Sequence, residues 1–167
     1  MVEHMLHLAR YNAWANARVY AAVAEVGDEA AWRDAGLFFG SVAATLNHLL
    51  VADRIWMRRF TGDGEHPARL DAILHRDLAA LADARRAEDA RILGWAAGLT
   101  EEALAREITY APVTRPGAVT SVLWMDLLHA FNHQTHHRGQ VHTGLLRLTG
   151  QEPPPLDMVL FARTLRA

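Results

Sequence analysis

The stretch Phe131–Gln140 reads FNHQTHHRGQ and holds three histidines within five positions, with His129 one helical turn upstream. In a helix, residues four apart lie on one face with Cβ atoms roughly 6 Å apart. His133 and His137 could then direct two imidazoles at one point, and imidazole is a common ligand of zinc, nickel, iron and copper. A solvated polar face, or core histidines hydrogen-bonded to neighbours, would show the same spacing.

The helix that contains this stretch is predicted to run from about Val122 to Leu148 and to end at Thr149-Gly150. At about 100° per residue, one narrow polar stripe follows its middle. The stripe consists of Asp126, His129, His133, His137, Gln140 and Gly144. Such a stripe inside a bundle is unfavourable unless metal, water or partners satisfy it. Helical bundles build metal sites from inward-facing side chains of neighbouring helices.

Hydrophobic periodicity predicts three further long helices. The first extends to about Val26, the second runs from its cap Ser41 to about Phe60, and the third runs from about Leu70 to Ala97. Residues 28–40 read as irregular. The predicted fold is therefore all-α.

Two shorter elements complete the prediction. Residues 106–110 and 117–121 are β-favouring runs around prolines and a glycine, which predicts a small hairpin or extended crossover between the third and last long helices. Three consecutive prolines at 153–155 force an extended link into a short terminal helix near residues 156–165. No domain boundary is visible, so residues 1–167 are expected to form one domain.

His48 lies inside the second predicted helix, which is apolar nearly all round. Its neighbours four residues away on the same face are Ala44 and Ala52, and these small side chains leave room around the imidazole. A lone buried histidine is usually structural. The alanines, together with the His133–His137 pair, favour His48 as a third metal ligand.

Composition excludes several classes of protein. The chain has no cysteine, which rules out a disulfide framework, a thiolate metal site and a cysteine nucleophile. Its formal net charge is -2 with no block of like charge, so no nucleic-acid partner is expected. The charged run 83–91 is predicted to face water. No signal peptide or membrane span is recognised, which predicts a cytoplasmic protein without a membrane partner.

Three neutral imidazoles would leave a divalent cation with its full charge and an open coordination position. Such an ion can lower the pKa of bound water or bind an incoming thiol. Asn12, Asp126 and Gln140 are candidates to orient the imidazoles by accepting their outer N–H protons. His129 could be a fourth ligand or a general base, and His136 is expected at the surface or behind the ligands.

Three stretches, residues 11–16, 45–56 and 132–141, resemble the DinB/YfiT-like metalloenzymes, and the likeness runs nearly from end to end. The resemblance implies a four-helix bundle with two long crossover connections. It also implies a divalent ion, zinc or nickel, held by three histidines that match His48, His133 and His137, and a homodimer. Some relatives are S-transferases or isomerases that use a low-molecular-weight thiol such as bacillithiol, mycothiol or glutathione, and others are hydrolases.

Two classes of function stay open from the sequence. One is an enzyme whose metal activates an external thiol, or water, against an electrophilic small molecule. The other is a non-catalytic metal-binding protein of the stress response, which a fourth protein ligand such as His129 would favour. A metal-free structural role for the histidines is the third reading.

Overall fold

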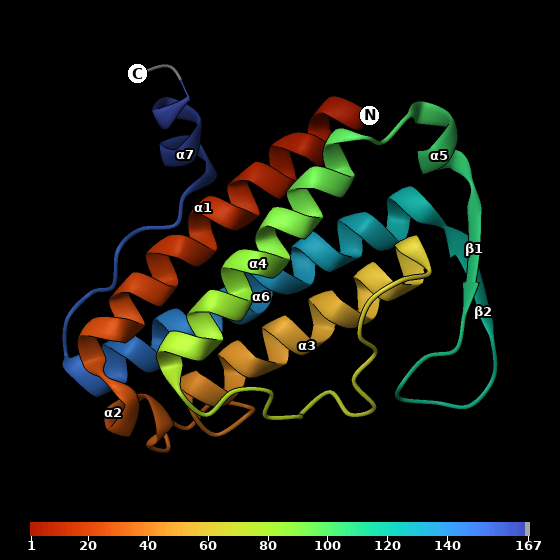
Figure 1. Ribbon diagram of the computed structural model, residues 1–167. Coiled ribbons are helices and arrows are strands. Elements are labelled where there is room, and N and C mark those ends of the chain that lie inside the picture. The colour runs from red at the N-terminus through yellow and green to blue at the C-terminus, as the bar shows by residue number, and fades with distance from the viewer. Residues whose placement is uncertain (166–167) are drawn as a thin grey trace.

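Four long helices form a bundle, with a two-stranded hairpin at one end and a short helix at the C-terminal end (Figure 1). The computed structural model describes residues 1–165, so the last two residues of the predicted domain lie outside it. Within residues 1–165 the elements are α1 (Val2–Val26), α2 (Asp28–Trp32), α3 (Val42–Thr61), α4 (Leu78–Ala97), α5 (Glu101–Ala105), β1 (Glu107–Tyr110), β2 (Val119–Val122), α6 (Leu123–Thr149) and α7 (Met158–Thr164). The bundle and its hairpin confirm the predicted all-α fold.

Capping residues fix the ends of the helices that carry the histidines. Ser41 is the N-cap of α3, and its hydroxyl accepts a hydrogen bond from the backbone N–H of Ala44 at 3.1 Å. α6 ends at Gly150, whose φ of 69° lies in the left-handed region that glycine adopts readily. Both of these predicted boundaries are confirmed, as is the end of α1 at Val26.

The predicted start of the third long helix at about Leu70 is wrong, because α4 begins at Leu78. Asn47 of α3 accepts hydrogen bonds from the backbone N–H groups of residues 74 and 75, at 2.8 and 3.0 Å. These bonds hold the preceding segment as a loop along α3. Asp77 then caps α4 by accepting from the backbone N–H three residues later, at 2.7 Å.

Among the shorter elements, the hairpin was predicted, whereas the helices α2 and α5 were not. β1 and β2 pair antiparallel, from Glu107 opposite Val122 to Tyr110 opposite Val119, which confirms the hairpin. The helices α2 and α5 have five residues each, too few to show a helical period in the sequence. Within residues 1–165 no helix has the length and apolar character needed to cross a membrane.

A layer of buried polar side chains crosses the bundle between two apolar parts of the core. One apolar part includes Met5, Phe60, Ile92 and Leu127, and the other includes Val23, Leu46, Leu81 and Leu145. Every long helix contributes polar residues to this layer. They are Asn12, Asn16, Asp53, Arg85, Glu88, Asp89, Gln134, His137 and Arg138.

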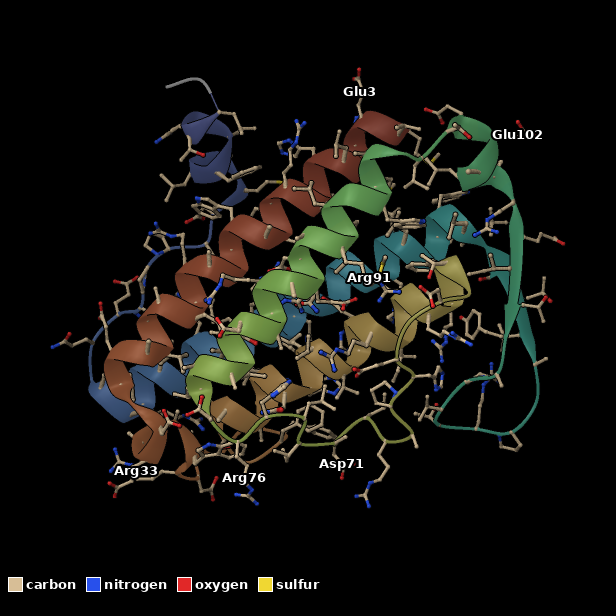
Figure 2. The ribbon with its side chains drawn as sticks, in the orientation of Figure 1. Glu3, Arg33, Asp71, Arg76, Arg91 and Glu102 are labelled. Carbon is tan, nitrogen blue, oxygen red and sulfur yellow. The ribbon has the colours of Figure 1, made fainter. Side chains whose placement is uncertain are left out.

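The prediction that residues 83–91 face water is wrong in part. Arg85 is 2% exposed, and Glu88 and Asp89 are also buried. Arg85 reaches across the core to Asp53 of α3, with 2.7 Å between Nη1 and Oδ2. A buried charge is tolerated when it is paired in this way. Other charged residues labelled in Figure 2, such as Arg33 after α2 and Glu102 of α5, project outward from the bundle.

Candidate metal centre

The structure brings together three histidines from two packed helices. His48 lies in the middle of α3, and His133 and His137 lie one turn apart on α6. The Nε2 atom of His48 is 3.2 Å from Nε2 of His133 and 3.2 Å from Nε2 of His137. Ligand atoms of all three lie within 4.8 Å of one another, which makes the cluster a possible metal site.

The outer nitrogens of two imidazoles are engaged with oxygen acceptors. Nδ1 of His48 lies 2.8 Å from the carbonyl oxygen of Leu70, and Nδ1 of His137 lies 2.8 Å from Oε1 of Gln140. Both oxygens can only accept, so each Nδ1 carries the proton and each neutral ring has a bare lone pair on Nε2. The two Nε2 atoms therefore face each other at 3.2 Å with no proton to share.

A shared cation relieves this contact. Two nitrogens bound about 2.0–2.1 Å from a tetrahedral zinc ion lie about 3.3 Å apart, close to the separations among these atoms. The donor set thus fits a divalent cation in both chemistry and spacing. Carbonyl or amide oxygens behind the ligating imidazoles are the usual means of fixing their orientation.

Burial keeps the three imidazoles neutral at pH 7. Loss of water lowers the pKa of His133 to about 3, with a further contribution from the neighbouring imidazoles. Burial likewise lowers the pKa of His137 to about 4, although its hydrogen bond to Gln140 acts in the opposite direction. The pKa of His48 is also lowered, mainly by burial. Neutral imidazole is the form that binds metal.

A ring that the sequence analysis missed covers one side of the cluster. Phe39, in the segment before α3, stacks on His48 with ring centroids 4.0 Å apart and an interplanar angle of 24°. Its centroid is 5.7 Å from that of His137. Phe39 lies in a segment without helical or strand periodicity, so no pattern in the sequence pointed to it.

His129 lies beside the cluster, outside the three converging residues. Its ring centroid is 6.1 Å from that of His133 and 5.4 Å from that of Trp56. His129 is exposed and lines the same cavity as His48 and His133. This position suits a group that exchanges protons with a molecule in the cavity.

The three residues expected to orient the imidazoles have different surroundings. Gln140 accepts from His137, as described, and its Nε2 also donates to Nε2 of His136 at 3.1 Å. Asp126 instead accepts from the hydroxyl groups of Ser121 and Tyr110. The Asn12 side chain is bound to Arg138 and Asp89, in the charged part of the core.

A cavity of about 350 Å³ opens on the His133 side of the cluster. Its walls come from α3, α6, the hairpin and the loop before α4, and they include Ala52, Trp56, Leu70 and Tyr110. The volume is at the small end of the range of about 300–1,000 Å³ typical of small-molecule sites. Ala52 leaves space beside His48, in agreement with its expected role.

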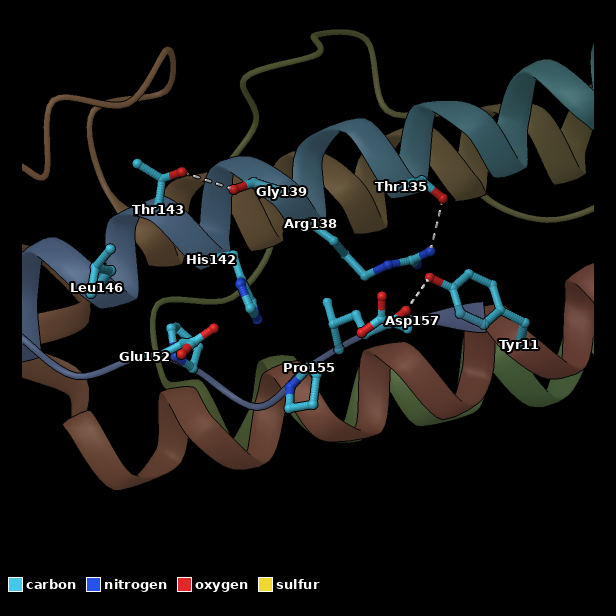
Figure 3. Close-up of a pocket in the computed structure, with 12 residues that line it drawn as sticks. Tyr11, Thr135, Arg138, Gly139, His142, Thr143, Leu146, Glu152, Pro155 and Asp157 are labelled. Atoms are coloured by element: carbon cyan, nitrogen blue, oxygen red, sulfur yellow. Dashed lines mark hydrogen bonds between the residues drawn. The ribbon is translucent and has the colours of Figure 1, made fainter. Parts of the chain in front are cut away.

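A larger cavity of about 720 Å³ lies between α1, α6 and the segment before α7 (Figure 3). Its histidine, His142, bonds through Nε2 to the carbonyl of Pro154 at 2.8 Å. The hydroxyl of Tyr11 donates to the carbonyl of Leu156 at 2.7 Å. These hydrogen bonds attach the C-terminal segment to the bundle. The candidate metal ligands His48 and His133 line the smaller cavity instead, so the candidate chemistry is placed there.

The fold and the cluster define the class of protein: a four-helix bundle with a possible three-histidine metal site between two of its helices. The chain belongs to the DinB family, whose model matches residues 1–165. It is 25% identical to Protein DinB of Bacillus subtilis (strain 168) over 170 residues, which cover 96% of this chain and 95% of that protein. No solved structure gives a significant match.

Proposed function

We propose that this protein is a metal-dependent enzyme that holds a divalent cation, zinc or nickel, through His48, His133 and His137. The observation that carries the proposal is the 3.2 Å approach of the Nε2 atoms of His48 and His137, whose Nδ1 atoms both lie 2.8 Å from an oxygen acceptor. Such an arrangement is unfavourable without a cation between the rings. Membership of the DinB family agrees with the resemblance that implied these ligands.

The bound cation would lower the pKa of a water molecule or of an external thiol at its open position. The thiol must come from a cosubstrate, because the chain contains no cysteine. His129, exposed on the wall of the cavity, is suited to accept the proton that the nucleophile loses. The Leu70 carbonyl and Gln140 hold two imidazoles in the orientation that presents Nε2.

The cavity supports an enzyme over a non-catalytic metal-binding protein. A structural metal site is usually closed by four protein ligands. In the described part of the chain the cluster contains three, and His133 lines a cavity large enough for a small electrophile. The proposed reaction is transfer of a thiol to that electrophile, or its hydrolysis by water.

Metal analysis of the purified protein tests the site. We expect about one divalent cation per chain in the wild type and its loss in His48→Ala and in His133→Ala. His142→Ala is the matched control, because His142 is also on α6 and lies outside the cluster. Full metal content in both cluster variants would reject the site.

An assay of electrophilic substrates with a panel of biological thiols, and with water alone, tests the reaction. Turnover that requires a thiol supports the transferase, and turnover without one supports the hydrolase. Absence of turnover under all conditions in metal-loaded protein would favour the non-catalytic alternative. A homodimer, as the family resemblance implies, is the assembly we propose, and light scattering of the purified protein tests its mass. We also propose a cytoplasmic location, which rests on the sequence analysis.

A further inference from the structure

The cavity beside the three histidines carries positive charge and no negative charge. Arg59 of α3 and Arg115 of the hairpin connection line it, and none of its lining residues is an aspartate or glutamate. Arg115 is exposed at the hairpin, whereas Arg59 is half-buried. A cavity lined by one sign of charge concentrates ligands of the opposite sign.

Arg59 is held in a fixed position by two aromatic rings. Its guanidinium carbon is 4.4 Å from the centroid of Trp56 and 4.2 Å from that of Tyr110. The two rings are themselves 5.4 Å apart and nearly perpendicular, at 77°, so the guanidinium packs into the corner between them. Cation–π contacts of this kind fix the group before any ligand arrives.

The hydrogen-bonding capacity of Arg59 is mostly unused. Of its five N–H donors, the hydrogen bonds found within residues 1–165 use one, from Nη2 to the carbonyl of Ala111 at 3.3 Å. Its Nε is buried and has no partner there. The carboxylate of Asp126 is near enough to act on Arg59 electrostatically. The oxygens of Asp126, however, accept hydrogen bonds from the hydroxyl groups of Tyr110 and Ser121.

Two arginines buried in the bundle interior, Arg85 and Arg138, have structural roles, and Arg138 donates to the amide oxygens of Asn12 and Asn16. Arg85 has carboxylates on both sides, Asp53 at 2.7 Å and Asp89 at 3.0 Å. Arg59 has no carboxylate within ion-pair distance among the described residues. A half-buried cation without a direct ion pair, in a ligand-sized cavity, favours a ligand that supplies a negative charge.

We propose that the cavity binds a small molecule with a carboxylate, which lies against Arg59 with Arg115 nearby, and whose reactive end faces His48 and His133. This inference rests on the proposed function, and it names the chemistry of the molecule that the site takes. At about 1.5 Å rise per residue, the backbones of His48 and Arg59 are about 16 Å apart along α3, and both side chains lean toward its N-terminus. The longer arginine side chain can reach further in that direction, which shortens the span between the two side-chain ends. The carboxylate belongs either to the thiol cosubstrate or to the electrophile.

Binding measurements with matched probes test the proposal and separate the two sources. The first pair is 3-mercaptopropionate and 3-mercapto-1-propanol, titrated into cobalt-loaded protein and followed by the visible absorption of the cobalt–thiolate. The second pair is benzoate and benzamide, titrated by calorimetry into both metal-free and cobalt-loaded protein. Each titration is run with the wild type, Arg59→Gln, Arg59→Lys and Arg58→Gln. Arg58 is exposed and adjacent in sequence, so it is the matched control for loss of one charge.

We expect the anionic member of at least one pair to bind about tenfold or more tightly than its neutral analogue, as charge-assisted hydrogen bonds predict. Arg59→Gln should abolish this preference, Arg59→Lys should keep part of it, and Arg58→Gln should keep all of it. Preference in the thiol pair assigns the carboxylate to the thiol, and preference in the benzoate pair assigns it to the electrophile.

Equal binding of both members in both pairs, or a preference that survives Arg59→Gln, would overturn the proposal. Failure of the wild type to bind cobalt would instead contradict the proposed metal site. In that case the benzoate titration of metal-free protein still decides whether Arg59 selects a carboxylate. A thermal melt of each variant confirms that it is folded.

Discussion

Two clusters of polar side chains lie within this bundle, and they differ in how their polar atoms are paired. The charge cluster, formed by Asn12, Asn16, Asp53, Arg85, Asp89 and Arg138, contains two cations and two anions and draws on all four long helices. The histidine cluster, formed by His48, His133 and His137, contains three neutral rings whose ligand atoms lie within 4.8 Å of one another.

The charge cluster balances its formal charges without any added group, although Nε of Arg85 and Nε of Arg138 have no hydrogen-bond partner within residues 1–165. Asp89 accepts from Nδ2 of Asn16 at 3.0 Å and pairs with Arg85, while Arg138 donates to the amide oxygens of Asn12 and Asn16. Burial acts to lower the pKa of Arg85, but the two carboxylates hold it above its ordinary value. Nε2 of His48 and Nε2 of His137 are both acceptors on the inner side of the histidine cluster. The first cluster therefore pairs its charges within the fold, whereas the second presents ligand atoms that could hold a cation.

Removal of one partner from the charge cluster should have the largest effect. Asp89→Ala leaves Arg85 with one carboxylate and removes the acceptor of Asn16, so we expect a loss of about 3–5 kcal/mol in unfolding free energy. Urea denaturation of the metal-free protein measures it. Glu88→Ala, whose side chain pairs with Arg91 at the edge of the bundle, is the control and should cost less. An equal loss in both variants would mean that the cluster has no special role.

Addition of metal should stabilise only a protein with an intact histidine cluster. Zinc at about one hundred times its dissociation constant should raise the unfolding free energy by about 2.7 kcal/mol, because the cation binds the folded state. Thermal melts with and without zinc measure the effect. The increase should vanish in His48→Ala and persist in His142→Ala. Equal stabilisation of His48→Ala would place the bound zinc elsewhere.

Gln140 should tune the affinity for metal through His137. Gln140→Ala removes the acceptor 2.8 Å from Nδ1, and loss of such an orienting group weakens metal binding by about 10–100-fold. Competition with a chromophoric chelator gives the dissociation constant. Gln140→Glu keeps an acceptor and should bind as tightly as the wild type. If both variants bind alike, the hydrogen bond does not orient the ligand.

The two clusters should also contribute with opposite signs to the acid stability of the metal-free protein. His133 and His137 have a folded-state pKa of about 3 and about 4, below the unfolded value, so the unfolded chain binds more protons and their contribution falls as the pH drops from 7 to 4. Burial raises the pKa of Asp89 to about 6, against the opposing pull of Arg85, so its contribution rises over the same interval.

Comparison of stability curves between pH 7 and 4 separates these contributions. His133→Gln should lose less stability on acidification than the wild type, since the variant has one buried imidazole fewer to protonate. Asp89→Asn should lose more stability than the wild type. The effects are modest, because His133 is partly exposed. Identical slopes in the wild type and His133→Gln would show that this imidazole is already solvated when the protein is folded.

The parts of the fold that local chemistry decides could be predicted from the sequence. Ser41 and Gly150 act on their own helices, so their positions indicated where α3 begins and α6 ends. The grouping of His133 with His137 follows in the same way from their spacing on one helix. The sequence indicates His48 as the third ligand less directly, through its alanine neighbours and the family resemblance.

The parts decided by contacts between distant segments could not be predicted. The loop before α4 is held by Asn47, which lies 27 residues before Leu74 in the chain. Arg85 is buried because Asp53 of another helix faces it, and nothing within residues 83–91 signals that partner. Asn12 accepts from Arg138 of α6, and nothing in the sequence around Asn12 indicates that partner. Arg59 lines the cavity because Tyr110 of the hairpin packs against both Arg59 and Trp56.

An anomalous-difference map from crystals of the zinc-loaded protein tests the central claim most directly. We predict one peak between α3 and α6, about 2.0–2.1 Å from Nε2 of His48, His133 and His137, with a fourth position open toward the cavity. No peak between these nitrogens at saturating zinc, or rings turned away from one another, would contradict the account.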